Sequence, residues 1–141
     1  MTVARLSPAT RKAAVALLLV AALATGAGLL FVFDPNAADS PLPQCLFRLL
    51  TGLYCPGCGM TRALHALLHA DVARAWAMNP MIVLMLALLP AMTWHQLGRQ
   101  PALPAPFSRV LMNGKAWIAL LVAFGVLRNL PWAAFAWMAP G

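Results

Sequence analysis

The thiol groups of three cysteines are the most reactive side chains in this chain. Cys55 and Cys58 form a Cys-x-x-Cys pair, and Cys45 precedes them in the same connection between apolar segments. Three uses of these thiols are open. A disulfide could staple a loop in an oxidising compartment, the pair could take part in thiol–disulfide exchange, or the thiolates could bind zinc.

The residues around the pair favour a tight turn followed by a helix. Proline fixes φ at the first central position of a type II turn and glycine supplies a positive φ at the second, so Pro56 and Gly57 predict such a turn. Gly59 then gives room to enter a helix from about Met60 to Ala70. Because the positive end of a helix dipole favours a thiolate, we expect a lowered pKa for the thiol just before this helix.

The sequence contains features for and against thiol–disulfide exchange at the Cys-x-x-Cys pair. Cys55 or Cys58 would be the nucleophile, at a helix N-terminus and near Arg62, with Cys45 exchanging with the pair. No βαβ pattern of the thioredoxin type surrounds the motif, however, and no signature of a quinone site accompanies it. A structural disulfide is therefore the favoured interpretation.

The same cysteines could form part of a zinc site. Zinc requires four ligands, and the sequence has no second Cys-x-x-Cys. Of the two histidines that follow, His69 lies about 15 Å along the predicted helix, too far from the turn. The candidate zinc ligands within one chain are therefore Cys45, Cys55, Cys58 and His65.

The composition places these residues in a membrane protein. Of the 141 residues, 62% are hydrophobic and 9% are charged, whereas about 25% are charged in an average globular domain. Three acidic and ten basic residues could not cover the surface of a soluble fold of this size. The basic residues are scattered and do not interleave with aromatic ones, which argues against nucleic acid as a partner.

Three apolar segments are predicted to cross the bilayer, over residues 13–33, 80–97 and 110–127. The first could instead be a cleaved signal peptide, because Ala22-Leu23-Ala24 has the small-x-small form. The apolar run continues to Phe33, however, and favours an uncleaved span. Six of the ten basic residues lie at the N-terminus or between the second and third spans, which predicts a cytoplasmic N-terminus and an outer location for the cysteines.

The connection over residues 34–79 is predicted to hold short interfacial helices. Arg62 and His65 share one stripe of the helix near Met60, opposite a leucine stripe. Asp71 is the expected N-cap of a second helix, from Val72 to Met78. Asn79-Pro80 then begins the second span, because asparagine accepts a bond from a free backbone N–H and proline fits the first turn.

Arg128 leaves two alternatives for the end of the chain. Either the third span continues to Met138 with Arg128 inside it, or it ends at Arg128 and the aromatic segment 131–138 lies in the interface. The second is preferred, since an arginine at mid-membrane is costly and tryptophan favours the headgroup level. Arg128 is then expected close to the loop 55–62, with Asp71 as its counter-ion.

A longer string around the cysteines resembles a known family. The run from Thr51 to Ala63 contains CPGCG-x-TRA, and Asp71, Asn79-Pro80 and Arg128-Asn129 follow it. These features are similar to domain of unknown function family 2752, over roughly residues 45–81. The resemblance implies a small multi-span protein of the bacterial inner membrane and implies no activity. The residues interpreted as structural parts of the motif are Gly57, Gly59, Thr61, Arg62, Asp71, Asn79, Pro80 and Arg128.

The sequence thus predicts an all-α integral membrane protein, one domain over residues 1–141, with three transmembrane helices and short interfacial helices. We expect a multi-pass inner-membrane protein without enzymatic activity, in which the CPGCG motif is a structural feature of the outer face. Its role would be membrane interaction or assembly, with the lipid bilayer and another membrane protein or a second copy as partners. The alternatives are a thiol–disulfide oxidoreductase that uses Cys55 and Cys58, or a zinc-binding membrane protein; no other cofactor is expected.

Overall fold

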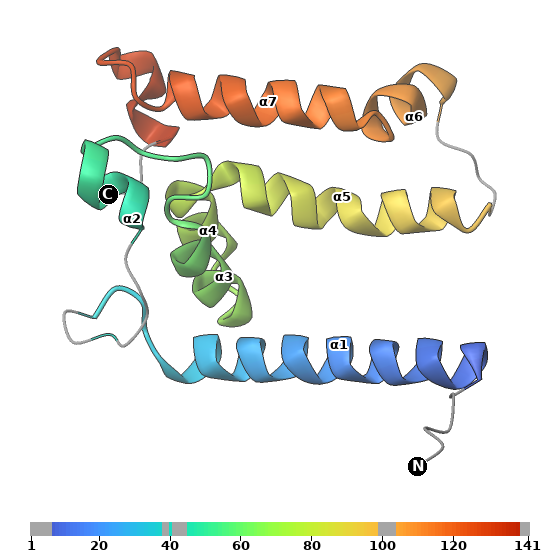
Figure 1. The fold of residues 1–141 in the computed structure, drawn as a ribbon. Coiled ribbons are helices and arrows are strands. Elements are labelled where there is room, and N and C mark those ends of the chain that lie inside the picture. The colour runs from blue at the N-terminus through green and yellow to red at the C-terminus, as the bar shows by residue number, and fades with distance from the viewer. Residues whose placement is uncertain (1–6, 38–39, 41–44, 99–103, 139–141) are drawn as a thin grey trace.

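The three longest helices of the chain lie along one axis and alternate in direction (Figure 1). The computed structural model describes residues 7–37, 40, 45–98 and 104–138, and in these residues every regular element is helical. The all-α prediction is therefore confirmed. The elements are α1 (Pro8–Val32), α2 (Leu46–Thr51), α3 (Met60–Leu68), α4 (Val72–Met78), α5 (Pro80–Gln96), α6 (Ala105–Leu111), α7 (Gly114–Leu127) and the 3-10 helix η1 (Ala133–Met138).

Two short helices, α3 and α4, pack between α1 and α5 (Figure 1). Ala63 and Ala66 of α3 meet Ala75 of α4, and these small side chains are almost completely buried, which allows the two helices to approach closely. α3 ends before the predicted Ala70, because Ala70 adopts a left-handed conformation with φ 60°. Asp71 then accepts a hydrogen bond from the backbone N–H of Arg74 at 2.9 Å, so the predicted N-cap of α4 is confirmed.

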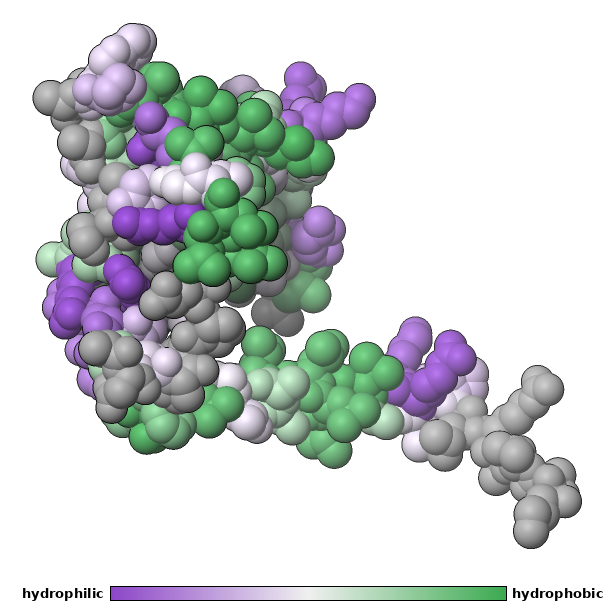
Figure 2. All heavy atoms as spheres, turned by 60° about the vertical axis from the view of Figure 1, so that its left-hand side comes forward, coloured by the Kyte–Doolittle hydropathy of each residue, from purple (hydrophilic) through white to green (hydrophobic). Residues whose placement is uncertain are grey.

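The first long helix, α1, has no buried residue. Leu17, Leu18 and Leu23 are 71%, 69% and 73% exposed, and the apolar surface of α1 ends at a polar N-terminal turn (Figure 2). Its C-terminal end contacts α3, where the rings of Phe31 and His69 stack at 4.5 Å. So large an apolar surface needs an apolar environment to cover it.

The lengths of the helices decide which could cross a membrane. α1 has 25 residues and is long and apolar enough, and α6 with α7 counts as a second span only if this pair, bent by 66°, is one broken span. α5 has 17 residues and α7 has 14. At 1.5 Å per residue they are about 26 Å and 21 Å long, less than the 30 Å or so of a hydrocarbon core. Three transmembrane helices are therefore not confirmed.

The third predicted span differs from the structure at its start. Instead of one helix over residues 110–127, the chain breaks after α6, and α7 begins at Gly114. The break has a local cause, because the side chain of Asn113 accepts a hydrogen bond from the backbone N–H of Lys115 and caps the new helix. At the other end α7 stops at Leu127 and η1 follows separately, which confirms that this helix does not continue through Arg128.

Candidate tri-cysteine site

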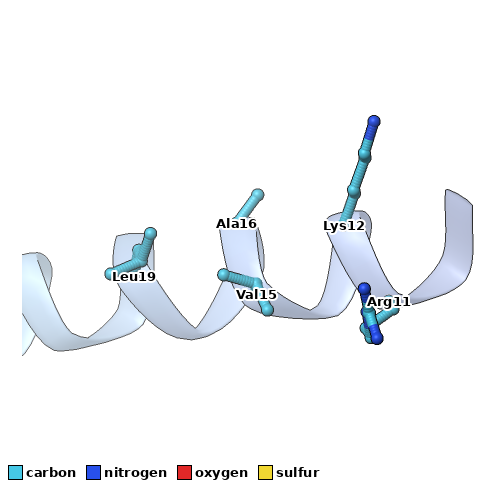
Figure 3. A pocket seen from close by; sticks show the side chains of 5 residues that line it. All are labelled: Arg11, Lys12, Val15, Ala16 and Leu19. Carbon is cyan, nitrogen blue, oxygen red and sulfur yellow. The ribbon is translucent and has the colours of Figure 1, made fainter. Parts of the chain in front are cut away.

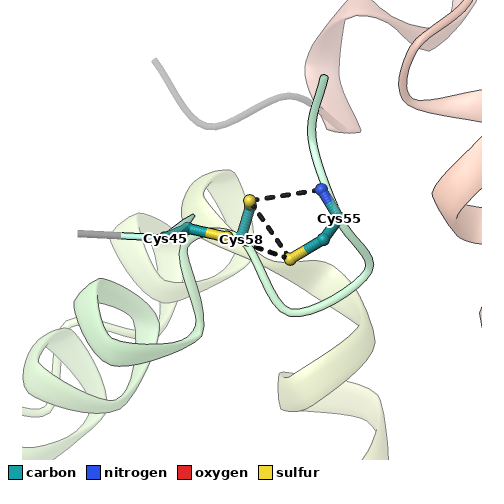
Figure 4. A group of neighbouring side chains, drawn as sticks. All are labelled: Cys45, Cys55 and Cys58. Carbon is teal, nitrogen blue, oxygen red and sulfur yellow. Dashed lines mark hydrogen bonds between the residues drawn. The ribbon is translucent and has the colours of Figure 1, made fainter. Parts of the chain in front are cut away.

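The sulfur atoms of the three cysteines converge (Figure 4). Cys55 Sγ lies 3.2 Å from Cys58 Sγ and 3.4 Å from Cys45 Sγ, and all three atoms lie within 4.8 Å of one another. Cys58 is buried, with 4% of its surface exposed, while the other two are partly buried. The backbone N–H of Cys55 also donates to Cys58 Sγ at 3.2 Å. The start of α2 thus brings Cys45 to the pair.

The turn between the paired cysteines is not of the predicted type. The backbone N–H of Cys58 donates to the carbonyl of Cys55 at 3.0 Å, so the turn closes. Gly57, however, is not among the residues with positive φ, which a type II turn requires. The residue with a positive φ is Gly59, whose φ of 81° lies in the left-handed region at the N-cap of α3. The type II prediction is therefore wrong, and Gly59 supplies the special conformation.

Two side chains from distant helix ends hold the carbonyl groups of this turn. Arg128 Nη1, at the end of α7, donates to the carbonyl oxygens of Cys55 at 2.9 Å, Cys58 at 3.2 Å and Pro56 at 3.4 Å. Asn79 Nδ2, at the start of α5, donates to those of Pro56 and Cys58, both at 3.1 Å. Asn79 also caps α5 as predicted, since its Oδ1 accepts from the backbone N–H of Ile82. The turn is therefore fastened to both helices through its backbone.

A third side chain, Asn129, holds the backbone segment that leads into the turn. Its Oδ1 accepts from the backbone N–H of Tyr54 and its Nδ2 donates to the Tyr54 carbonyl, both at 2.7 Å. Nδ2 also donates to the carbonyl of Gly125 at 2.6 Å. Next to this pairing α7 touches the turn, because a Cβ added at Gly125 would lie 2.8 Å from Cγ of Pro56. Only glycine allows this close approach without displacement.

Arg128 is a buried cation without a carboxylate partner in the described part of the chain. It is 3% exposed, and its Nε and Nη2 atoms have no hydrogen-bond partner. Its guanidinium lies 4.8 Å from the ring of Phe124 and 5.4 Å from that of Tyr54. The expected ion pair with Asp71 is wrong: that carboxylate caps α4 instead. The carbonyl groups of the turn replace it.

The environments of the thiols separate their pKa values. Interaction with the backbone N–H of Arg48, and then with the thiol of Cys58, lowers the pKa of Cys45 from its ordinary value of 9.0 to about 7. Burial raises the pKa of Cys58 to about 12, and the adjoining thiol of Cys55 adds to this rise. The thiol just before α3 was expected to have a lowered pKa, whereas burial raises the pKa of Cys58.

The structure does not bring His65 to the cysteines. The His65 ring faces α1, where Nδ1 bonds to the carbonyl of Leu30 and Nε2 lies 3.8 Å from Asp34. The group of potential metal ligands in the described residues accordingly contains the three cysteines and not His65. Thr61 and Arg62, the other polar residues of the motif, are half-buried in the first turn of α3.

Sequence reasoning missed two residues that position the turn. In the sequence, Asn129 stands out only as part of an Arg-Asn string, and Gly125 belongs to no motif. A polar residue that ends an apolar helix and a glycine inside one are both signals of a close backbone contact. Neither signal identifies the partner, which lies far away in the sequence.

Residues 45–93 match the family described as "Protein of unknown function (DUF2752)". The match confirms the predicted resemblance over this part of the chain. It contains all three cysteines and Asn79, and it ends before α7. No curated protein and no solved structure matches the chain.

Proposed function

We propose, on the premise that residues 45–93 are a DUF2752 region, that the three cysteines form a binding site for a thiophilic divalent cation, zinc before others, in a small membrane protein. The convergence of the three sulfur atoms within 4.8 Å carries this proposal. The bound ion would join the start of α2 to the turn before α3. Its role would be structural and would serve assembly in the membrane, with no enzymatic step.

The sulfur spacing supports zinc. A zinc ion with tetrahedral geometry and Zn–S distances of about 2.3 Å holds its sulfur ligands about 3.8 Å apart. The observed separations of 3.2 Å and 3.4 Å need to widen by about half an ångström to reach this value. Cys45 and Cys55 are partly exposed, which leaves a route for the ion.

The charge of the surroundings also favours a metal–thiolate centre. Zinc with three thiolates has a net charge of −1, and the nearby guanidinium of Arg128 has a charge of +1 and no carboxylate partner among the described residues. A buried charge is stable only when it is compensated. The site would therefore be neutral with zinc bound, and a water molecule or a group from another molecule would be the fourth ligand.

A membrane location is the second part of the proposal. Arg11 and Lys12 lie at the start of α1, and the apolar residues Val15, Ala16 and Leu19 follow (Figure 3). Basic residues at this position favour a cytoplasmic N-terminus. We take α5 and the bent α6–α7 pair as the two shorter spans, since the long helices alternate in direction (Figure 1). The cysteines would then lie at the outer face of the bacterial inner membrane.

Metal analysis of the purified protein tests the site. We expect about one zinc ion per chain by elemental mass spectrometry. Substitution of the zinc by cobalt should give the charge-transfer absorption of a cobalt–thiolate site. Each single replacement by serine, at Cys45, Cys55 or Cys58, should remove most of the bound metal. His65→Ala is the matched control, because His65 faces α1, and it should retain the metal. Thiols that are all free, or bridged in pairs, in metal-free protein from cells would contradict the proposal.

Thiol–disulfide exchange is a second candidate, favoured by the contact of Cys55 with both other cysteines. The Cys45 thiolate would attack Cys55 of a Cys55–Cys58 disulfide, form the Cys45–Cys55 bond and release Cys58 as the thiolate. A pKa of about 12 makes Cys58 a poor leaving group, whereas a metal deprotonates its thiol ligands outright. Zinc binding is therefore preferred. A mixed disulfide trapped on Cys55 or Cys58 would reverse this preference.

A further inference from the structure

An apolar pocket of about 500 Å³ adjoins the tri-cysteine site. Leu53 and Phe47 line it on the side of α2, and Val122 and Val126 line it on the side of α7. Cys55 forms part of the wall between the two sides. The size is that of a site for a small molecule or a single hydrocarbon chain.

The polar groups in the wall of this pocket are already paired. Tyr54 and Asn129 line the pocket, but the side-chain amide of Asn129 bonds to both backbone polar groups of Tyr54 and to the carbonyl of Gly125. The carbonyl of Cys55 accepts from Arg128. A water molecule needs two or more polar partners to be stable in a pocket, and these paired groups leave few. The wall therefore suits hydrocarbon.

A cation lies beside the pocket. The guanidinium of Arg48 stacks over the ring of Tyr54, with 4.1 Å from Cζ to the centroid. The surface around it is apolar, since Leu50 of α2 is 75% exposed and Val122 of α7 is 59% exposed. The described carboxylates make their contacts elsewhere: Asp34 accepts hydrogen bonds from Asn36 and lies 3.8 Å from His65, and Asp71 caps α4. An anionic group attached to a hydrocarbon chain would thus meet a positive charge at one end and apolar side chains along its length.

We propose that this pocket binds one acyl chain of an anionic phospholipid, with the phosphate next to Arg48. This inference rests on the membrane location of α7 proposed above and does not depend on the metal. An acyl chain fits between α2 and α7 because the polar groups of the pocket wall are already hydrogen-bonded. The positive charge of Arg48 accounts for the preference for an anionic headgroup. The lipid would cover the partly exposed Cys55.

Photocrosslinking with synthetic lipids tests the pocket. The protein is reconstituted with phosphatidylglycerol that carries a diazirine in its acyl chain, and the labelled residues are mapped by mass spectrometry. We expect labels concentrated on Phe47 and Val126. Val122→Trp should fill the pocket and remove them, whereas Ile118→Trp, on the same helix and 64% exposed outside the pocket, should not.

The headgroup is tested with the same label on phosphatidylcholine. Arg48→Gln should lower the preference for phosphatidylglycerol about fivefold, and the exposed Arg109→Gln should leave it unchanged. Labels spread evenly along α7, labels retained in Val122→Trp, or equal labelling by both lipids would each overturn the inference. Extraction of the native protein from membranes by alkaline carbonate would instead overturn the membrane location, and metal content in the same samples reports on the tri-cysteine site separately.

Discussion

The guanidinium of Arg128 lies 2.9 Å from the carbonyl oxygen of Cys55, although 73 residues separate the two in the chain. This contact joins the end of α7 to the turn that brings two of the cysteines together. The same nitrogen also reaches Cys58, on the far side of the turn. The position of the sulfur atoms therefore depends on the last long helix as well as on the local sequence.

Arg128→Leu should destabilise the protein by about 2–3 kcal/mol, because buried carbonyl groups lose a charged donor. Thermal unfolding in detergent measures the change. Arg109→Leu, at an exposed position of α6, should change stability by less than about 0.5 kcal/mol. Arg128→Lys keeps the charge without the planar fork, so it should retain zinc better than Arg128→Leu does. Equal stability of the Arg128→Leu and Arg109→Leu variants would refute the role of the contact.

Gly125→Ala should destabilise the protein by about 1–3 kcal/mol through overpacking, since its Cβ would meet the ring of Pro56 at 2.8 Å. Gly114→Ala, in the same helix with open space around it, is the control and should be neutral or slightly stabilising. If the clash is the cause, Pro56→Ala should rescue much of the loss in the double variant. Additive effects of the two substitutions would show that no such contact exists.

Asn79→Ser should separate capping from anchoring. Serine caps a helix about as well as asparagine does, but it cannot donate to the carbonyls of both Pro56 and Cys58. A loss of about 1–3 kcal/mol is expected, because Asn79 is 2% exposed and its partners would be left unpaired. Asp71→Ser changes a cap that has no such second role and should be nearly neutral. A comparable loss in both variants would assign Asn79 to capping alone.

Alkylation of the metal-free protein should distinguish the cysteines by pH. Labelling of Cys45 by iodoacetamide should rise around pH 7, whereas Cys58 should stay unreactive until strongly alkaline pH. The pKa of Cys45 is 9.0 in the unfolded chain and about 7 in the folded protein. Its ionisation therefore stabilises the fold fully above pH 9, and this stabilisation is lost as the pH falls through about 7. Cys58 has the opposite sign: its contribution is full below pH 9 and is lost as the pH rises toward about 12. Identical pH profiles for the two thiols would contradict these environments.

Local signals predicted the elements that carry the site. Asp71 and Asn79-Pro80 marked the starts of α4 and α5 correctly, because an N-cap depends on residues within one turn of it. The break at Asn113 is also a cap, but it was hidden in an apolar run that suggested one continuous span. Hydrophobic periodicity locates such a run better than it locates the interruptions inside it.

The geometry of the site could be predicted only in part. The proximity of Cys55 and Cys58 follows from the motif, and Cys45, a third candidate ligand in the sequence, lies beside them in the structure. His65 had suitable spacing, yet the packing of α3 turns its ring toward Leu30 and Asp34 of the α1 end. Arg128 is close to the cysteine loop, as the sequence predicts. Its hydrogen-bond partners, however, are backbone carbonyl groups, and these cannot be recognised from the amino-acid sequence. Long-range contacts of this kind require the arrangement of the helices.

In the membrane location proposed above, the attachment of α1 at its C-terminal end would affect how the protein responds to bilayer thickness. Its contacts with α3 involve Leu30, Phe31 and the adjoining Asp34, and none of its residues is buried. A helix whose main contacts with the described residues lie at one end can relieve hydrophobic mismatch by a change in its tilt. A thicker or thinner bilayer would then swing α1 about its C-terminal end, while the hydrogen bonds that fasten the cysteine turn to α5 and α7 stay intact.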